Sequence, residues 1–221
     1  MNLDHIGERM TSAFLEGKRY VRVERDEYTD FDYPKLLKLM RFHTERHCVD
    51  GYGHFMTMHT HTALGMELLT ASFMPGEGLQ VPYCLIDIMT VGKKRTVFVE
   101  YYDCTVQKPD MPRLEQVGSR YAALPEYSEK PKWYVGERAP YSLIKCGGKS
   151  DESLLEEMIF ASICAYNAEI SLADDDPANN TGLKAFRERM INEGNPSSAV
   201  LEKVFGKEGA KEFFIRCVMP I

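Results

Sequence analysis

The chain has 221 residues, of which 44% are hydrophobic and 27% charged, a balance typical of a globular domain. A net charge of −6 argues against a nucleic-acid binder, because phosphate contacts need clustered Lys and Arg. No apolar run reaches the roughly 18 residues of a membrane span, and the N-terminus resembles no secretory signal. We therefore expect one cytoplasmic domain over residues 1–221, with six reduced cysteines, because their spacing matches no metal site.

The apolar periodicity predicts helices at both ends of the chain and strands between them. The first elements that we expect are a helix over 1–17, a strand over 19–24 and a helix over 35–48. Four strands follow, over 53–61, 66–74, 82–91 and 95–103. Their connections are short and carry Gly or Pro, which predicts antiparallel neighbours, because parallel strands need long crossovers.

The last third of the chain is predicted to be mainly helical. The elements that we expect are a helix over 113–123, a strand over 141–146 and helices from 151, over 182–192, over 198–206 and over 208–218. A loop over 174–180 contains Pro177 and Asn179. Helices on both faces of the sheet would give an α+β fold, a three-layer α/β/α sandwich around a central antiparallel sheet.

Asp87 is the most informative single residue, because it interrupts the most apolar strand, in the run CLIDIM (residues 84–89). An unpaired buried charge is strongly unfavourable, so this side chain must be paired, protonated or facing a cavity. Burial raises a carboxyl pKa, which favours a proton donor near neutral pH. A structural Asp bonded to a neighbouring loop is the alternative.

Five of the six histidines lie within 19 residues, from His43 to His61. His43 and His47 would share one face of the predicted helix, and His59 and His61 one face of a strand. The two pairs together suit a zinc, iron or nickel site, and the alternative is exposed helix histidines beside a partly buried strand pair. His59 or His61 also suits proton transfer, because imidazole titrates near neutral pH.

Two stretches of the chain resemble the ferredoxin-dependent bilin reductases. In that family a strand ends in an aromatic residue or Met and Pro, a loop with a second Pro follows, and an apolar strand carries an Asp. Residues 66–87 match with FMP (73–75), VP (81–82) and Asp87. Residues 195–214 (NPSSAVLEKVFGKEGAKEFF) resemble the family's C-terminal helices. The resemblance covers about residues 50–218 in order.

The resemblance implies roles for single residues. Asp87 falls on the family's acidic proton donor, and His59 or His61 falls near a family Glu, so we expect these three to be catalytic. Thr70 stands where some members have a catalytic His. Asn195 lies near a catalytic Asp or Asn of the family, and we expect Thr70 and Asn195 to contact substrate.

The resemblance also implies a reductase of an open-chain tetrapyrrole, a bilin, held between the sheet and the C-terminal helices. Such an enzyme has no bound redox cofactor and no metal: electrons arrive singly from reduced ferredoxin, and site acids supply protons. Arg138 and Lys145 are expected to hold the propionates of the substrate. The basic run KKR (residues 93–95) is the candidate docking patch for ferredoxin, and the alternative is an ordinary solvated hairpin turn.

Two other functions stay open at the level of sequence. One is a protein of the same fold that binds a linear tetrapyrrole or haem without chemistry, which the Thr at position 70 favours. The other is a histidine-rich metalloenzyme unrelated to tetrapyrroles.

Overall fold

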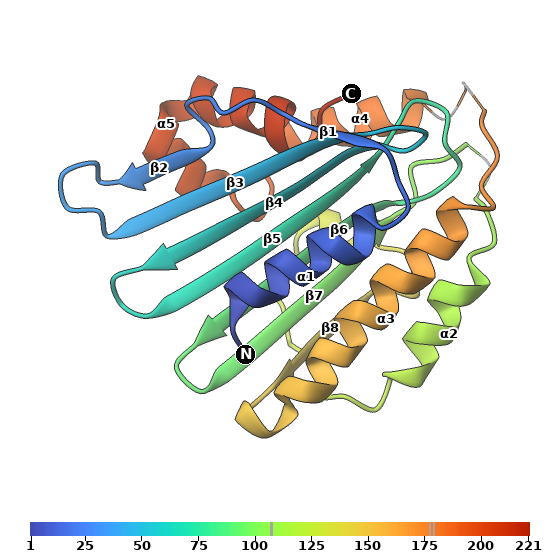
Figure 1. Ribbon diagram of the computed structural model, residues 1–221, viewed down its shortest axis with the longest axis horizontal. Coiled ribbons are helices and arrows are strands. Elements are labelled where there is room, and N and C mark those ends of the chain that lie inside the picture. Colours follow the sequence, from blue (N-terminus) through green and yellow to red (C-terminus); the bar gives the residue numbers. More distant parts are fainter. Residues whose placement is uncertain (107, 177, 179) are drawn as a thin grey trace.

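The computed structural model describes residues 1–106, 108–176, 178 and 180–221 (Figure 1). Its centre is an antiparallel sheet in which successive long strands are neighbours, as the short connections predict. The strands of this meander are β3 (Met40–Val49), β4 (Gly53–Thr62), β5 (Met66–Pro75), β6 (Tyr83–Val91), β7 (Lys94–Tyr102) and β8 (Leu143–Gly147).

Two short strands cover the outer edge of β3. β1 (Tyr20–Arg22) pairs with its C-terminal half and β2 (Asp30–Tyr33) with its N-terminal half. Backbone bonds of 2.8 Å, from Val23 N to Arg46 O and from Thr44 N to Thr29 O, fill the gap between them. At the opposite edge, the segment 125–127 bonds to β8 through Tyr127 N and Pro125 O.

Helices cover both faces of the sheet, which gives the predicted three-layer α/β/α sandwich (Figure 1). One face packs against α1 (Leu3–Leu15), α2 (Pro112–Arg120) and α3 (Glu152–Ile170). The other packs against α4 (Asn180–Asn192), α5 (Ser198–Phe213) and the short π-helical turn η4 (Phe214–Val218). Because alternate strand residues point to opposite faces, each of the strands β3 to β7 contributes to both cores.

The predicted helix over 35–48 is wrong, because residues 40–49 form the strand β3. Burial alternates over residues 41–46, where Phe42, Thr44 and Arg46 are buried and the residues between them are more exposed. Leu36 and Leu37, whose spacing favoured a helix, are exposed. The alternating burial along β3 is that of a strand. The helix-like spacing came from leucines that lie in the exposed connection before β3.

The other predicted elements are confirmed to within a few residues. The strand β2 and the short 3₁₀ helices η1 (Trp133–Glu137) and η2 (Lys149–Asp151) were not predicted. The helix break predicted near residue 207 lies at Gly206, whose φ of 75° favours glycine. In the predicted loop over 174–180, Pro177 and Asn179 lie outside the described residues. Among the residues described, no helix has both the length and the apolarity to cross a membrane.

The packing of α1 against the sheet gives a testable prediction. The Phe14 ring lies 4.8–5.0 Å from the rings of Tyr52, Phe55 and Phe73 and is fully buried. Phe14→Ala is expected to lower the free energy of unfolding by about 3–5 kcal/mol, because it opens a cavity. Leu36→Ala, at a site 97% exposed, is the control and should change it by less than about 0.5 kcal/mol. Equal effects in urea unfolding would contradict this packing.

Candidate active site around Asp87

Asp87 lies at the middle of β6, on the face covered by α4 and α5. Its direct cross-strand partners are Thr70 on β5 and Phe98 on β7, so all three point to the same face. The Thr70 hydroxyl donates a 2.5 Å hydrogen bond to Asp87 Oδ1. Thr70 and Asp87, which the sequence analysis singled out separately, are therefore in direct contact in the folded chain.

A second carboxyl group, Glu100, lies on the same face of the neighbouring strand β7. It follows Phe98 by two positions and is 1% exposed. The Tyr102 hydroxyl donates to Glu100 Oε1 at 3.1 Å, and the Arg138 guanidinium forms an ion pair with the same carboxyl group. A buried charge of this kind is tolerated only because a cation and a hydroxyl satisfy it.

Arg138 connects this buried pair to the outside of the site. Its guanidinium also contacts both carboxylate oxygens of Glu129, at 2.5 and 2.9 Å. A short backbone bridge between Arg138 and Tyr102 fixes the arginine beside the end of β7. One cation therefore lies between two carboxylates, while Nε of Arg138 is buried without a hydrogen-bond partner among the described residues.

Burial changes the acidity of both carboxyl groups. It raises the pKa of Asp87 to about 6, against the smaller opposing effects of the Thr70 hydrogen bond and the Arg138 charge. It raises the pKa of Glu100 to about 7, where the Arg138 charge lowers it and the Asp87 charge raises it further. Two acids that titrate near neutral pH on one face are able to give protons to a ligand.

Asp87 lines two cavities on this face. The first, of about 20 Å³, lies toward Thr70, Tyr83 and the Asn195 segment. The second, of about 250 Å³, is lined by the following residues: Leu68, Asp87, Met89, Phe98, Glu100, Glu129, Tyr134, Arg138, Pro196 and Ser197. Pro196 and Ser197 line both cavities, so the segment before α5 separates two spaces that both reach the carboxyl group of Asp87.

Two of the predicted substrate contacts lie at this site besides Thr70. Asn195 lines the smaller cavity, where its side chain donates to Met190 O at 3.1 Å and accepts from Ser197 N at 3.0 Å. Arg138 lines the larger one. The structure therefore brings Asp87, Thr70, Asn195 and Arg138 together.

Lys145 does not lie with them, which corrects its expected place in the site. It is two residues from Leu143 on β8 and so shares the face covered by α2 and α3. Its ammonium group donates to Ala122 O and Leu124 O, at 3.1 and 3.2 Å, and is buried. Lys145 satisfies the backbone carbonyls after α2 instead of facing the cavities.

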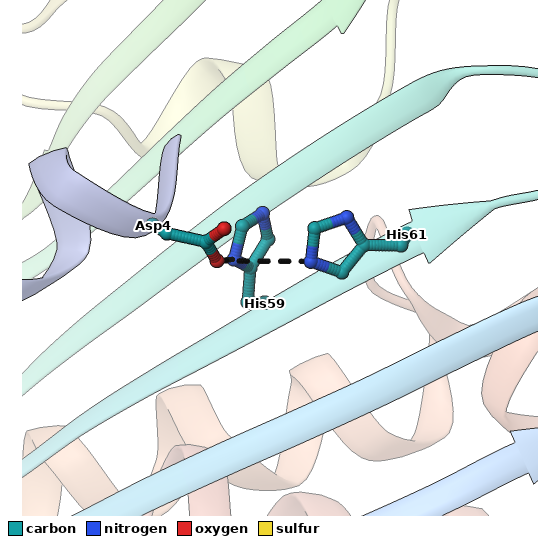
Figure 2. Close-up of side chains that lie close together, drawn as sticks. All are labelled: Asp4, His59 and His61. Atoms are coloured by element: carbon teal, nitrogen blue, oxygen red, sulfur yellow. Dashed lines mark ion pairs between the residues drawn. The ribbon is translucent and has the colours of Figure 1, made fainter. Parts of the chain in front are cut away.

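His59 and His61 also lie on the opposite face, under α1 (Figure 2). His59 is directly opposite Leu69, and Thr70 is opposite Met58, so the histidines and Asp87 are separated by the sheet. Burial lowers the pKa of His59, and its Nδ1 lies 2.6 Å from Asp4. The expectation that either histidine shares a site with Asp87 is therefore wrong, because their side chains point to the other face of the sheet.

Sequence reasoning did not assign Glu100, Glu129 or Tyr134 to the site. Glu100 carries the same signal as Asp87, a single acid in an apolar strand, and the short turn after Val91 would have fixed its register. Glu129 lies in an irregular connection and Tyr134 in the short 3₁₀ helix η1 (Trp133–Glu137) that follows it. Both segments are too short for a sequence periodicity to indicate which way a side chain points.

No family model and no curated protein sequence matches this chain. Its fold is, however, similar to that of a solved structure, phytochromobilin synthase from tomato in complex with biliverdin. The TM-score is 0.75 at 12% sequence identity, and the match covers 96% of this chain and 79% of the other. At this identity the comparison establishes the fold, an antiparallel sheet between two layers of helices.

The raised pKa of Asp87 predicts how stability depends on pH. The pKa of Asp87 is about 6 in the folded state and about 3.9 in the unfolded state, so the stability that its proton gives is lost as the pH rises from about 4 to about 6. Asp87→Asn removes this ionisation, so its free energy of unfolding relative to wild type should rise by about 2 kcal/mol from pH 4.5 to pH 8.

Urea unfolding at the two pH values measures this difference. Asp50→Asn, which removes an exposed carboxylate 3.5 Å from Arg19, is the control and should show little change with pH. A relative stability of Asp87→Asn that is the same at both pH values would contradict the burial of this carboxyl group.

Proposed function

We propose that the protein binds an open-chain tetrapyrrole on the face of the sheet that carries Asp87, and reduces it. The observation that carries the proposal is the Asp87 carboxyl group, an acid with a raised pKa that lines two cavities beneath α4 and α5. The shared fold with a biliverdin-bound phytochromobilin synthase supports the choice of ligand.

The larger cavity has the chemistry of a bilin site. Leu68, Met89 and Phe98 supply an apolar floor for flat pyrrole rings, and the acids lie along one side. Neither cavity alone reaches the roughly 300 Å³ of a typical small-molecule pocket. In this proposal Pro196 and Ser197 move outward on binding, which joins the two spaces at Asp87 and also enlarges them.

Reduction of one double bond consumes two electrons and two protons. In this proposal reduced ferredoxin delivers the electrons one at a time, and Asp87 gives the first proton to the bilin. Glu100 lines the same cavity and supplies the second. Its contact with Arg138 keeps the resulting carboxylate stable inside the protein.

Arg138 is the proposed partner of a propionate side chain. Its Nε is a buried donor without a protein acceptor among the described residues, and the guanidinium lines the larger cavity. A propionate carboxylate that replaces Glu129 would keep the cation paired, because guanidinium groups bind carboxylates through two hydrogen bonds.

The proposed electron-donor surface is the turn between β6 and β7. Lys93 and Lys94 are exposed there, and the Lys94 ammonium group lies 4.8 Å from the centre of the Tyr127 ring. Arg95 is largely committed within the chain, because its guanidinium contacts Glu152 at 2.7 Å and Gly92 O at 2.8 Å. The proposed docking contact therefore depends on the two lysines.

Biliverdin tests the proposal directly. Wild-type protein mixed with biliverdin at micromolar concentration is expected to show a red-shifted visible band, which decays when reduced ferredoxin is added. Asp87→Asn should keep the band, because the amide retains the size of the carboxyl group, and should lose turnover. Asp50→Asn is the matched control and should behave as wild type.

The outcomes separate the alternatives. A stable band that reduced ferredoxin does not change would favour the non-catalytic tetrapyrrole-binding protein. No spectral change with biliverdin would count against both bilin functions. Turnover that persists in Asp87→Asn would refute the proton-donor role while leaving bilin binding intact.

The same assay yields a pH profile. Since the acid form of Asp87 donates the proton, turnover should fall as the pH rises through about 6. Glu100, with a pKa of about 7, should extend this loss to higher pH. A rate that increases steadily from pH 5 to pH 8 would contradict proton donation by either acid.

A further inference from the structure

A second group of polar side chains lies on the opposite face of the sheet, under the N-terminal helix. Asp4 comes from the first turn of α1, and His59 and His61 come from β4, two positions apart on one face (Figure 2). Asp4 Oδ1 lies 2.6 Å from His59 Nδ1 and 3.7 Å from His61 Nε2. One ligand atom of each residue lies within 4.8 Å of those of the other two.

The three atoms converge as metal ligands do. Bonds of about 2.0–2.2 Å from zinc to imidazole nitrogen or carboxylate oxygen place such ligands roughly 3–3.5 Å apart. Small side-chain movements suffice to reach this spacing, because the Asp4 and His61 side chains are 68% and 42% exposed. Two imidazoles and one carboxylate form a ligand set used for zinc and non-haem iron(II).

The surroundings of His61 fit this interpretation. Its other ring nitrogen, Nδ1, lies 3.4 Å from Glu67 Oε1, directly opposite on β5. Histidine ligands commonly donate their second N–H group to a carboxylate, which orients the ring and strengthens the metal bond. The Glu67 contact leaves Nε2 of His61 directed at Asp4.

His59 has one polar contact among the described residues, and that contact lies in the cluster. The residue is 8% exposed, and its Nε2 is buried with no hydrogen-bond partner in the described part of the chain. The imidazole ring is therefore held by packing, with Nδ1 directed at Asp4. A ring fixed in this way requires little reorganisation to bind an ion.

A cavity of about 360 Å³ adjoins the cluster. It lies between α1 and the sheet, and its polar lining includes Asp4, Glu8, His43, Glu45 and His59. Three protein ligands leave at least one coordination position of a metal ion unfilled, as in catalytic zinc sites. Water or a small anionic ligand in the cavity has room to fill this position.

We propose that Asp4, His59 and His61 bind one divalent transition-metal ion, of the class of zinc, iron(II) and cobalt(II), with an open coordination position beside this cavity. Magnesium and calcium do not fit this site, because both ions prefer oxygen ligands and two of the three ligands here are imidazole nitrogens. The proposal departs from the expectation of no metal. It does not depend on the bilin proposal, because the sheet separates it from Asp87.

Titration of chelator-treated protein with cobalt(II) tests the site. Wild-type protein is expected to bind one equivalent with a visible absorption band, and zinc should displace the cobalt. Asp4→Asn and His61→Ala remove partly exposed ligands, so both variants should fold and lose the band. Glu67→Gln should weaken binding about 10-fold to 100-fold.

Two controls address other histidines. His5→Ala changes the exposed residue beside Asp4 and should bind cobalt as wild type does. His54→Ala removes the histidine whose Nδ1 lies 3.6 Å from Cys48 Sγ, the competing place for an ion. Loss of the band in His54→Ala with retention in Asp4→Asn would overturn the proposal, as would the absence of saturable binding in wild type.

Thermal unfolding provides a second measurement. An ion that binds only the folded state raises the unfolding temperature with its concentration. Zinc should therefore raise the unfolding temperature of the wild-type protein, in which it links α1 to β4. It should leave the unfolding temperature of Asp4→Asn unchanged. Equal stabilisation of both proteins would contradict the proposed ligands, whatever the result of the biliverdin assay.

Discussion

The cross-strand register of β5, β6 and β7 is the constraint on which the candidate active site depends. It places Thr70 directly beside Asp87 and places Glu100 diagonally across from it on the same face. A shift of one residue in either pairing would turn an acid toward α3 and leave an apolar side chain in its place. The short turn after Val91 sets the register of β6 with β7, because β6 is apolar on both faces and its pattern alone does not distinguish a shift of one residue.

The distribution of charge within the site separates the roles of its two acids. Glu100 has a cation and a hydroxyl group as partners, from Arg138 and Tyr102. For Asp87, the described residues provide one side-chain hydrogen bond, from the uncharged Thr70. Burial outweighs these partners at both positions, because the pKa is about 6 for Asp87 and about 7 for Glu100. Glu100 therefore keeps its proton to higher pH than Asp87, and its contacts with Arg138 and Tyr102 stabilise the carboxylate that forms once the proton has left.

Much of the fold was predictable because its elements are regular. Short Gly- and Pro-containing turns indicated the antiparallel meander, and the single acid in an apolar strand indicated Asp87. The β3 strand was not predictable from spacing alone, because Leu36 and Leu37 belong to an exposed connection and imitate a helical period.

The composition of the site depended on which face each side chain occupies. His59 and Thr70 lie on neighbouring strands, but their register places them on opposite sides of the sheet. The sequence of one strand shows which of its residues share a face, whereas the register between two strands depends on the geometry of the turn that joins them. Lys145 was misplaced for the same reason. Glu129 and Arg138 lie outside the regular helices and strands, so the sequence gives no periodicity from which the direction of their side chains could be predicted.

The way in which β3 is bordered has a consequence for the behaviour of the protein in concentrated solution. An uninterrupted outer strand offers free amide and carbonyl groups on which another chain can add its own strand. Here β1, β2 and the bonds between them occupy this border, and the segment 125–127 occupies the border of β8. Within the described residues, neither edge of the sheet presents a long unpaired strand. The fold therefore disfavours edge-to-edge pairing between chains, the first step toward fibres.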